Sequence, residues 1–265
     1  MSRPLNPIDV REQYRKTANL QSRIDLHARF STNPYGWQRW VLDRMQLPAK
    51  ARVLELGCGP GTLWLDNRHR LPADWEVLLS DRSAAMVQQA LERLAPTDHP
   101  WRFLLADAAA VPVATYSVDA VIANHMLYHV GDVQNAVAGI CRVLRPGGRL
   151  FAATIGHGHL TELQQSLARF DPSLAHWGQA IYERFDLDNG RFLLESWFDR
   201  VETHEYEDGL VVTQAQPLAD YVLSTLSDAS GLRPRLIQWF ESELARCGGA
   251  MHISKRSGIL IGVRR

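Results

Sequence analysis

The sequence is poor in cysteine and shows no excess of charge of either sign. Its 265 residues include three cysteines, none of them in a C-x-x-C pair. Free thiols in a reducing compartment are therefore expected, rather than a disulfide framework or a zinc knuckle. Lys and Arg number 29, as do Asp and Glu, so the formal net charge is zero. Because a phosphate backbone usually selects a basic surface, this balance argues against a nucleic-acid partner.

Long apolar segments are also missing. No run approaches the ~20 apolar residues that a membrane-spanning helix needs. The N-terminal stretch Met-Ser-Arg-Pro-Leu-Asn-Pro lacks the apolar core of a signal peptide. We therefore expect a cytoplasmic protein with no membrane partner, and either a monomer or a homodimer.

Short apolar runs alternate with helical patterns from residue 51 to residue 155, which is typical of βαβ units. We expect an α/β fold with a doubly wound, mostly parallel seven-stranded sheet and helices on both faces. The predicted strands are 52–56, 76–80, 101–106, 118–124, 149–155, 201–206 and 253–263. The predicted helices between and after them are 83–94, 132–144, 188–199, 218–226 and 234–247.

The length suits one large domain, so we predict that residues 1–265 form a single domain. Within it, residues 1–47 are expected to form an N-terminal helical lid, broken near Asn33-Pro34-Tyr35-Gly36. Residues 48–156 are the expected cofactor-binding core. Residues 157–265 are expected to add helical insertions on the substrate side and the last strands.

Residues Val53 to Gly61, Val-Leu-Glu-Leu-Gly-Cys-Gly-Pro-Gly, form the most informative stretch. A strand that ends in alternating glycines lets a ligand approach bare backbone, because glycine has no Cβ. A dinucleotide site would need G-x-G-x-x-G, but Thr62 stands where the third glycine is required. A tight turn without a ligand is the plain alternative. Glu55 is unusual inside such a strand, since an unpaired buried carboxylate is costly.

The second predicted strand is followed directly by Asp81, 20 positions after Gly61. An acid at this place can accept hydrogen bonds from both ribose hydroxyls of a nucleoside. It could instead only cap the next helix, but Ser83 suits that cap. The third predicted strand is followed by Asp107-Ala108, a place suited to contact with an adenine edge, and the alternative for Asp107 is a solvated loop residue.

Several motifs in one order resemble the class I S-adenosylmethionine (SAM) dependent methyltransferases. They are the glycine turn, the stretch from Asp81 to Met86, Asp107-Ala108, the run from Val118 to Val130, and Leu144-Arg-Pro-Gly-Gly148. The resemblance covers about residues 50 to 156. It implies SAM as the cofactor and S-adenosylhomocysteine as its product.

The resemblance also implies a set of cofactor-binding residues. Glu55 would reach the amino group of the cofactor, Met86 would cover the adenine, and Asp107 would accept from the exocyclic amine. The full implied set is Glu55, Gly57, Cys58, Gly59, Gly61, Asp81, Arg82, Met86, Asp107, Ala108, Asn124 and His125.

Methyl transfer requires a nucleophile in line with the S–CH₃ bond, which positioning alone can favour by ~7–11 kcal/mol. A general base is needed only if the nucleophile arrives protonated, and histidine suits that role. The candidate catalytic residues are His125, Tyr128 and His129 after the fourth strand, His157 and His159 after the fifth, and Tyr14 in the N-terminal lid. For each histidine a structural or surface role is the alternative. His157 and His159 offer only two ligands, so no metal is expected.

Two other functions stay open for the chain. One is an NAD(P)-dependent oxidoreductase, which the missing third glycine and Asp107 count against; the other is a non-catalytic SAM-binding module. The N/D-P-P-Y/F motif of many amino-methylating enzymes is absent, because Asn124 is followed by His125-Met126-Leu127. We therefore expect a small-molecule acceptor with an O, N or C nucleophile.

Overall fold

The computed structural model describes residues 17–226 and 231–265, without the side chains of residues 180–182. Tyr14, a candidate catalytic residue, lies outside the described residues. The chain groups into two compact units. Unit 1 comprises the described residues up to Pro34 with 158–180 and 207–256, and unit 2 comprises 35–157, 181–206 and 257–265. The expected single domain stays a prediction, and each unit is described by itself.

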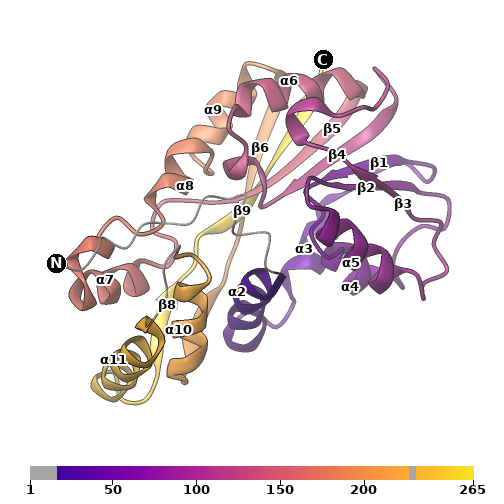
Figure 1. The fold of residues 1–265 in the computed structure, drawn as a ribbon. Helices are drawn as coiled ribbons and strands as arrows, with labels where there is room; N and C mark the ends of the chain where they lie inside the picture. The colour runs from indigo at the N-terminus through magenta and orange to yellow at the C-terminus, as the bar shows by residue number, and fades with distance from the viewer. Residues whose placement is uncertain (1–16, 227–230) are drawn as a thin grey trace. The chain divides into compact units, whose positions relative to one another are not determined.

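Unit 2 contains a seven-stranded sheet in the order β3-β2-β1-β4-β5-β9-β6 (Figure 1). The first five strands of this order pair in parallel, whereas β9 is antiparallel to both β5 and β6. The predicted seven-stranded, mostly parallel sheet is thereby confirmed. The strands are β1 Arg52–Leu56, β2 Glu76–Asp81, β3 Arg102–Leu105, β4 Val118–Asn124, β5 Leu144–Ile155, β6 Phe198–Tyr206 and β9 Ser257–Arg264.

Helices cover both faces of this sheet, as a doubly wound fold requires. One face packs with α3 (Trp37–Arg44), α4 (Thr62–Asn67) and α5 (Ala84–Leu94). The other face packs with α6 (Val133–Val143) and α9 (Asn189–Glu195). Unit 2 also contains the short helices η1 Ala108–Ala110 and η2 Leu127–His129, whereas η3 Pro172–Leu174 belongs to unit 1 and α8 Gln179–Arg184 crosses the boundary between the units.

Strand β4 lies in the middle of the sheet and is apolar on both sides. Ala120 and Ile122 face the core that contains α3 to α5, while Val121 and Ala123 face the core that contains α6. All four side chains are fully buried. A central parallel strand covered on both faces has a continuous apolar sequence for this reason. Because β4 is parallel to β1, the two strands end at the same edge of the sheet.

Helices α5 and α6 begin where the sequence predicts, because each has a side-chain cap. The Ser83 hydroxyl accepts a hydrogen bond from the Met86 N–H, and the Asp132 carboxylate accepts one from the Asn135 N–H. Such caps satisfy backbone donors that the first helical turn leaves unpaired. Since Ser83 caps α5, Asp81 is available for another role.

Unit 1 is built from helices and a two-stranded antiparallel sheet of β7 and β8. Its core gathers buried leucines of the four helices, such as Leu26, Leu163, Leu218 and Leu236. Its elements are α2 Thr17–Phe30, α7 Thr161–Phe170, α10 Ala215–Leu223, α11 Leu232–Arg246, β7 Gly209–Val212 and β8 Met251–Ser254.

Two predicted elements near the C-terminus are wrong in their bounds. The helix predicted over 188–199 ends at Glu195, and Phe198 begins β6. Phe198 is fully buried against Gly262, where a Cβ would stand 2.7 Å from the Phe198 ring, so strand packing overrides the helical pattern. The strand predicted over 253–263 is two strands, β8 and β9, which belong to different sheets.

The described residues include no helix that combines the length and apolarity needed to cross a membrane. The cytoplasmic location and the monomeric or dimeric state stay predictions.

Candidate functional site

The turn after β1 is formed by glycines in the left-handed backbone region. Gly57, Gly59 and Gly61 have φ angles of 65°, 52° and 73°, which side-chain-bearing residues rarely adopt. The Cys58 N–H donates to the Ser80 carbonyl at 2.9 Å, and the Gly61 N–H donates to the Cys58 carbonyl at 3.1 Å. The turn is therefore held against the end of β2 and leads directly into α4.

Asp81 ties the end of β2 to this turn. Its Oδ2 accepts a hydrogen bond from the Gly59 N–H at 3.0 Å, and its Oδ1 accepts one from the Ser83 N–H at 2.8 Å. Burial raises the pKa of the carboxyl group, and the donors from Ser83 and Gly59 oppose that rise. Each carboxylate oxygen has more than one lone pair, so both oxygens can also accept from a ligand hydroxyl.

Glu55 lies inside the core of unit 2 with 2% of its surface exposed. Its Oε2 accepts a hydrogen bond from the Trp64 indole N–H at 2.6 Å. Burial raises the pKa of Glu55 to about 8, although the Trp64 donor lowers it, and the nearby Asp81 charge adds to the rise. A carboxyl group poised in this way releases its proton when a cation comes near.

Gly57 lies against Met126, in the segment that follows β4. A Cβ at Gly57 would stand 2.8 Å from the Met126 Cβ, closer than such atoms approach. A side chain at position 57 would therefore push Met126 away or alter the turn. Glycine is therefore favoured at position 57 both by this close approach and by the φ angle.

The other predicted cofactor residues lie at the ends of β2 and β3. The Asp107 carboxylate accepts a hydrogen bond from the Ala109 N–H at 2.9 Å and is exposed, while Ala108 is buried. Arg82 is exposed and Met86 is fully buried. Since β2 and β3 pair in parallel, with Asp81 opposite Leu105, these residues share the carboxyl edge with the glycine turn.

Asn124 and the residues after it contact α3. The Asn124 Oδ1 accepts a hydrogen bond from the Trp37 indole N–H at 3.2 Å, and the rings of Trp37 and His125 have centroids 4.9 Å apart. His125 has a φ of 54°, unusual for a residue with a Cβ. Strain of this kind often accompanies function.

The candidate bases Tyr128 and His129 lie together in η2, just after β4. Their ring centroids are 4.4 Å apart, and both side chains are half-buried. His125 is close to the pair, with its ring centroid 6.4 Å from that of Tyr128. The structure thus brings three of the predicted catalytic candidates to one end of β4.

The two remaining histidine candidates have different surroundings. His157 is exposed, and its Nε2 lies 3.2 Å from the Asp186 Oδ2. His159 belongs to unit 1 and is 6% exposed, and its Nδ1 accepts a hydrogen bond from the Arg256 N–H at 3.2 Å. The His159 ring therefore contributes a buried hydrogen bond to the structure of unit 1.

Sequence reasoning passed over Trp64, Met126 and the pair Asp186 and Asp188. Trp64 and Met126 look like ordinary core residues, and only the packing of separate elements shows that Trp64 contacts Glu55 and that Met126 lies against Gly57. The only signal was position: Asp186 stands just before the helix predicted over 188–199, and Asp188 is its first residue. Nothing in the sequence joins them to His157.

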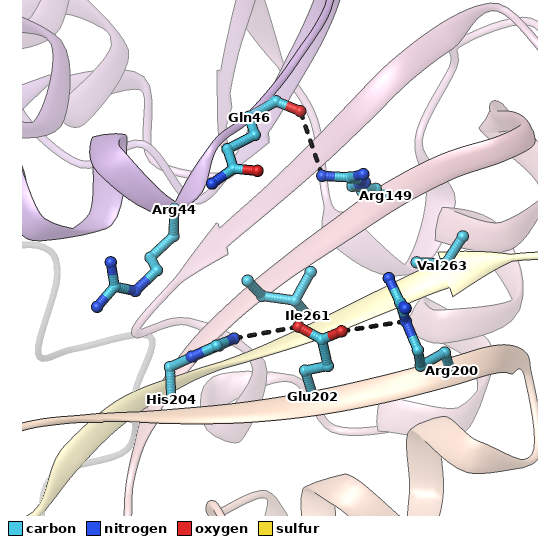
Figure 2. A pocket seen from close by; sticks show the side chains of 8 residues that line it. All are labelled: Arg44, Gln46, Arg149, Arg200, Glu202, His204, Ile261 and Val263. Carbon is cyan, nitrogen blue, oxygen red and sulfur yellow. Dashed lines mark hydrogen bonds and ion pairs between the residues drawn. The ribbon is translucent and has the colours of Figure 1, made fainter.

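A cavity of about 490 Å³ lies elsewhere on unit 2 and contains none of the predicted site residues. Figure 2 shows that Glu202 lies between His204 and Arg200, while Arg149 donates to the Gln46 carbonyl on the other side. Two of the residues that line the cavity, Arg149 and Val263, are paired at the amino end of the part of β5 that pairs with β9. The glycine turn follows the carboxyl end of β1, so the cavity is not the cofactor site. It is lined by Arg44, Gln46, Arg149, Arg200, Glu202, His204, Ile261 and Val263.

The glycine turn and its acids fit SAM by their chemistry. The glycines at positions 57, 59 and 61 give a tight left-handed turn at the carboxyl end of β1, and Asp81 beside it can accept from hydroxyl groups. Glu55 supplies a buried carboxyl group that an ammonium group would ionise. A pyrophosphate site would need a third glycine at position 62, where the chain has Thr62.

Comparison with known proteins supports the same family. Residues 53–148 match the family model described as a methyltransferase domain. The malonyl-[acyl-carrier protein] O-methyltransferase of Enterobacter lignolyticus is 37% identical over 131 residues, which are 48% of this chain and 48% of that protein. The 2-phytyl-1,4-naphtoquinone methyltransferase of Thermosynechococcus vestitus is 28% identical over 159 residues, covering 59% of this chain and 69% of that protein.

Solved structures share the fold. The phosphoethanolamine N-methyltransferase 2 of Haemonchus contortus, in complex with phosphomonomethylethanolamine and S-adenosylhomocysteine, matches with a TM-score of 0.60. It is 18% identical, and the match covers 96% of this chain and 58% of that chain. The chain spans about half the length of the malonyl-[acyl-carrier protein] O-methyltransferase that it matches. Residues 53–148 therefore constitute a methyltransferase domain, in the fold shared with methyltransferases of known structure.

Proposed function

We propose that the protein transfers a methyl group from SAM to a small-molecule acceptor and releases S-adenosylhomocysteine. The observation that carries this proposal is the left-handed glycine turn after β1, held by the Asp81 carboxylate through the Gly59 N–H. When bound, SAM supplies an electrophilic methyl group on its sulfonium. The protein has to bind SAM and the acceptor, orient them for methyl transfer, and exclude water from the site.

Each part of the carboxyl edge has a role in this proposal. Asp81 accepts from the ribose hydroxyls, Glu55 pairs with the amino group, and Asp107 with the Ala108 N–H reads the adenine edge. Met86 packs behind the adenine, and the end of β4 at Asn124 and His125 closes the site. Gly57, Cys58, Gly59, Gly61 and Arg82 complete the proposed cofactor set.

The acceptor is proposed to lie near the end of β4. His129 is the leading candidate for a general base, with His125 and Tyr128 beside it. A base contributes ~10²–10⁴-fold when the acceptor is protonated. An acceptor that arrives as an anion would need positioning alone. The loss of kcat in a His129 variant would therefore report whether the acceptor arrives protonated.

A two-stage experiment tests the function. Calorimetry first measures binding of SAM, S-adenosylhomocysteine and NAD to the purified chain. Tight NAD binding without SAM binding would overturn the proposal in favour of an oxidoreductase. The second stage follows transfer of a labelled methyl group to a panel of acceptors.

The acceptor panel follows from the names of the relatives and from the open choice of nucleophile. It includes malonyl thioesters, naphthoquinones, and small amines and phenols. Transfer to one class, dependent on Asp81, supports the proposal. Firm SAM binding without transfer to any acceptor in the panel would instead indicate a non-catalytic SAM-binding module.

A further inference from the structure

Three possible metal ligands meet at the carboxyl end of β5. His157, Asp186 and Asp188 each offer one ligand atom, and these atoms all lie within 4.8 Å of one another. His157 comes two residues after β5 ends, and both acids stand just before α9. On the sequence, His157 had only His159 as a companion ligand. The fold supplies two carboxylates from about thirty residues further along the chain.

The backbone around Asp186 is fixed by β5. The Thr154 hydroxyl donates to the Phe185 carbonyl at 2.9 Å, and the Leu187 N–H donates to the Ile155 carbonyl at 3.1 Å. Phe185 and Leu187 are both buried in the core of unit 2. Asp186 is thus held between two buried apolar side chains, and its own side chain is fully buried.

The two carboxylate oxygens of Asp186 have different surroundings. Oδ1 accepts hydrogen bonds from the N–H groups of Asp188 at 2.8 Å and Asn189 at 2.7 Å. Oδ2 has no hydrogen-bond partner among the described residues, although the His157 Nε2 lies 3.2 Å away. A buried anionic oxygen without a hydrogen bond is costly unless a positive charge stands next to it.

The distance between Oδ2 and Nε2 suits two ligands of one ion. Ligands at the usual ~2.0–2.2 Å from Zn²⁺ lie about 3–3.5 Å from each other. Two atoms that bind the same ion lie close together without a hydrogen bond between them, as Asp186 Oδ2 and His157 Nε2 do here. Two carboxylates and a neutral imidazole also carry a formal charge of −2, which matches a divalent cation.

We propose that His157, Asp186 and Asp188 bind a divalent cation of the Zn²⁺ or Mn²⁺ type. One imidazole nitrogen and two carboxylate oxygens form a donor set that these ions accept. His157 and Asp188 are exposed, so the cation keeps coordination positions open to water or to an anionic oxygen ligand. The ion lies at the edge of the sheet where β1 and β4 also end.

Direct metal binding tests the proposal and does not depend on methyl transfer. The chain is stripped with a chelator, loaded separately with Zn²⁺ and Mn²⁺, and analysed by elemental analysis and calorimetry. One equivalent of one of these ions per chain is expected. His157→Ala and Asp188→Ala change exposed side chains and should weaken binding by about 10–100-fold or more. Asp186→Asn should abolish it.

A second histidine–carboxylate pair provides the matched control. His204 Nε2 lies 3.3 Å from the Glu202 Oε2 on β6, and no third ligand joins them in the described clusters (Figure 2). His204→Ala should leave the stoichiometry and the affinity unchanged. The proposal is overturned if the wild-type chain binds neither ion stoichiometrically. It is equally overturned if His157→Ala and Asp188→Ala bind as the wild type does, which would leave His157 and Asp186 as a plain ion pair.

Discussion

The Asp81 carboxylate accepts the Gly59 N–H at 3.0 Å and so joins the end of β2 to the turn after β1. The parallel register of the two strands, with Leu56 opposite Ser80, brings these residues together although 22 positions separate them. The same carboxylate can shape the turn and accept from a ligand. The proposed ligand contact and the observed shape of the turn would therefore depend on the same carboxylate.

Replacing Asp81 by alanine should weaken SAM binding. Loss of charge-assisted hydrogen bonds costs ~1.5–3 kcal/mol, which corresponds to roughly 10–150-fold in Kd. Calorimetry with S-adenosylhomocysteine measures the change. Asp98→Ala removes an exposed acid outside the proposed site and serves as the control. Equal affinity of Asp81→Ala and wild type would remove Asp81 from the site.

Replacing Gly59 by valine should block SAM binding while the chain stays folded. Gly59 has a φ of 52°, which a β-branched residue adopts only with strain, and the new side chain would project from the turn. Gly147→Val is the matched control, because Gly147 has a φ of 76° and open space around it. Both variants should lose similar stability in thermal denaturation, and only Gly59→Val should lose the cofactor. Normal SAM affinity of Gly59→Val would contradict the proposed turn.

Glu55 should make the stability of the protein depend on pH. Its pKa in the folded chain rises from 4.5 to about 8, mainly through burial. Between these values the folded chain holds a proton that the unfolded chain releases. This contribution to stability is thus complete below pH 4.5 and is lost as pH rises toward 8, at up to ~1.4 kcal/mol per pH unit. Urea denaturation at several pH values should show a steeper decline for wild type than for Glu55→Gln.

Binding of SAM should also release a proton from Glu55. At neutral pH the buried carboxyl group is mostly protonated, and the ammonium group of the cofactor would favour its ionised form. Calorimetry in buffers of different ionisation enthalpy should therefore show proton release by wild type that is smaller in Glu55→Gln. The same proton count for both proteins would indicate that Glu55 does not meet the amino group.

His129→Ala and His159→Ala should separate a base from a structural residue. If the acceptor needs deprotonation, His129→Ala should lower kcat by ~10²–10⁴-fold without a comparable loss of stability. His159 is buried and accepts from the Arg256 N–H, so His159→Ala should lower the melting temperature. Its turnover per folded molecule should stay near that of wild type. The reverse pattern would exchange the two roles.

The three cysteines should differ in reactivity toward thiol reagents. Burial, then the nearby Glu55 and Asp81, raises the pKa of Cys58, and burial raises that of Cys141 to about 11. Cys247 is exposed at the end of α11. Since the thiolate is the reactive form, one thiol per native chain should react rapidly and three after unfolding. Cys247→Ser should remove the rapid phase, and a second rapid thiol in the native chain would contradict the burial of the other two.

The sequence was sufficient for the parallel strands of the sheet and for the glycine turn after β1. Apolar runs such as that of β4 and caps such as Ser83 act over a few residues, so local pattern predicted them closely. The glycines after β1 specify a left-handed turn wherever that strand lies. The late part of the chain was harder, because Phe198 reads as helical until its packing against Gly262 is known.

By itself the sequence determined that β1 ends in a glycine turn followed by an acid at the end of β2, and hence the class of cofactor expected there. Only the tertiary structure decided that Trp64 hydrogen-bonds Glu55, that Met126 covers Gly57, and that Asp186 lies against His157. The reason is physical: periodicity and turn chemistry are short-range properties of the chain. A contact between separate elements, whether 9 positions apart as for Glu55 and Trp64 or tens of positions apart, depends instead on how strands are ordered in the sheet and how helices pack on them.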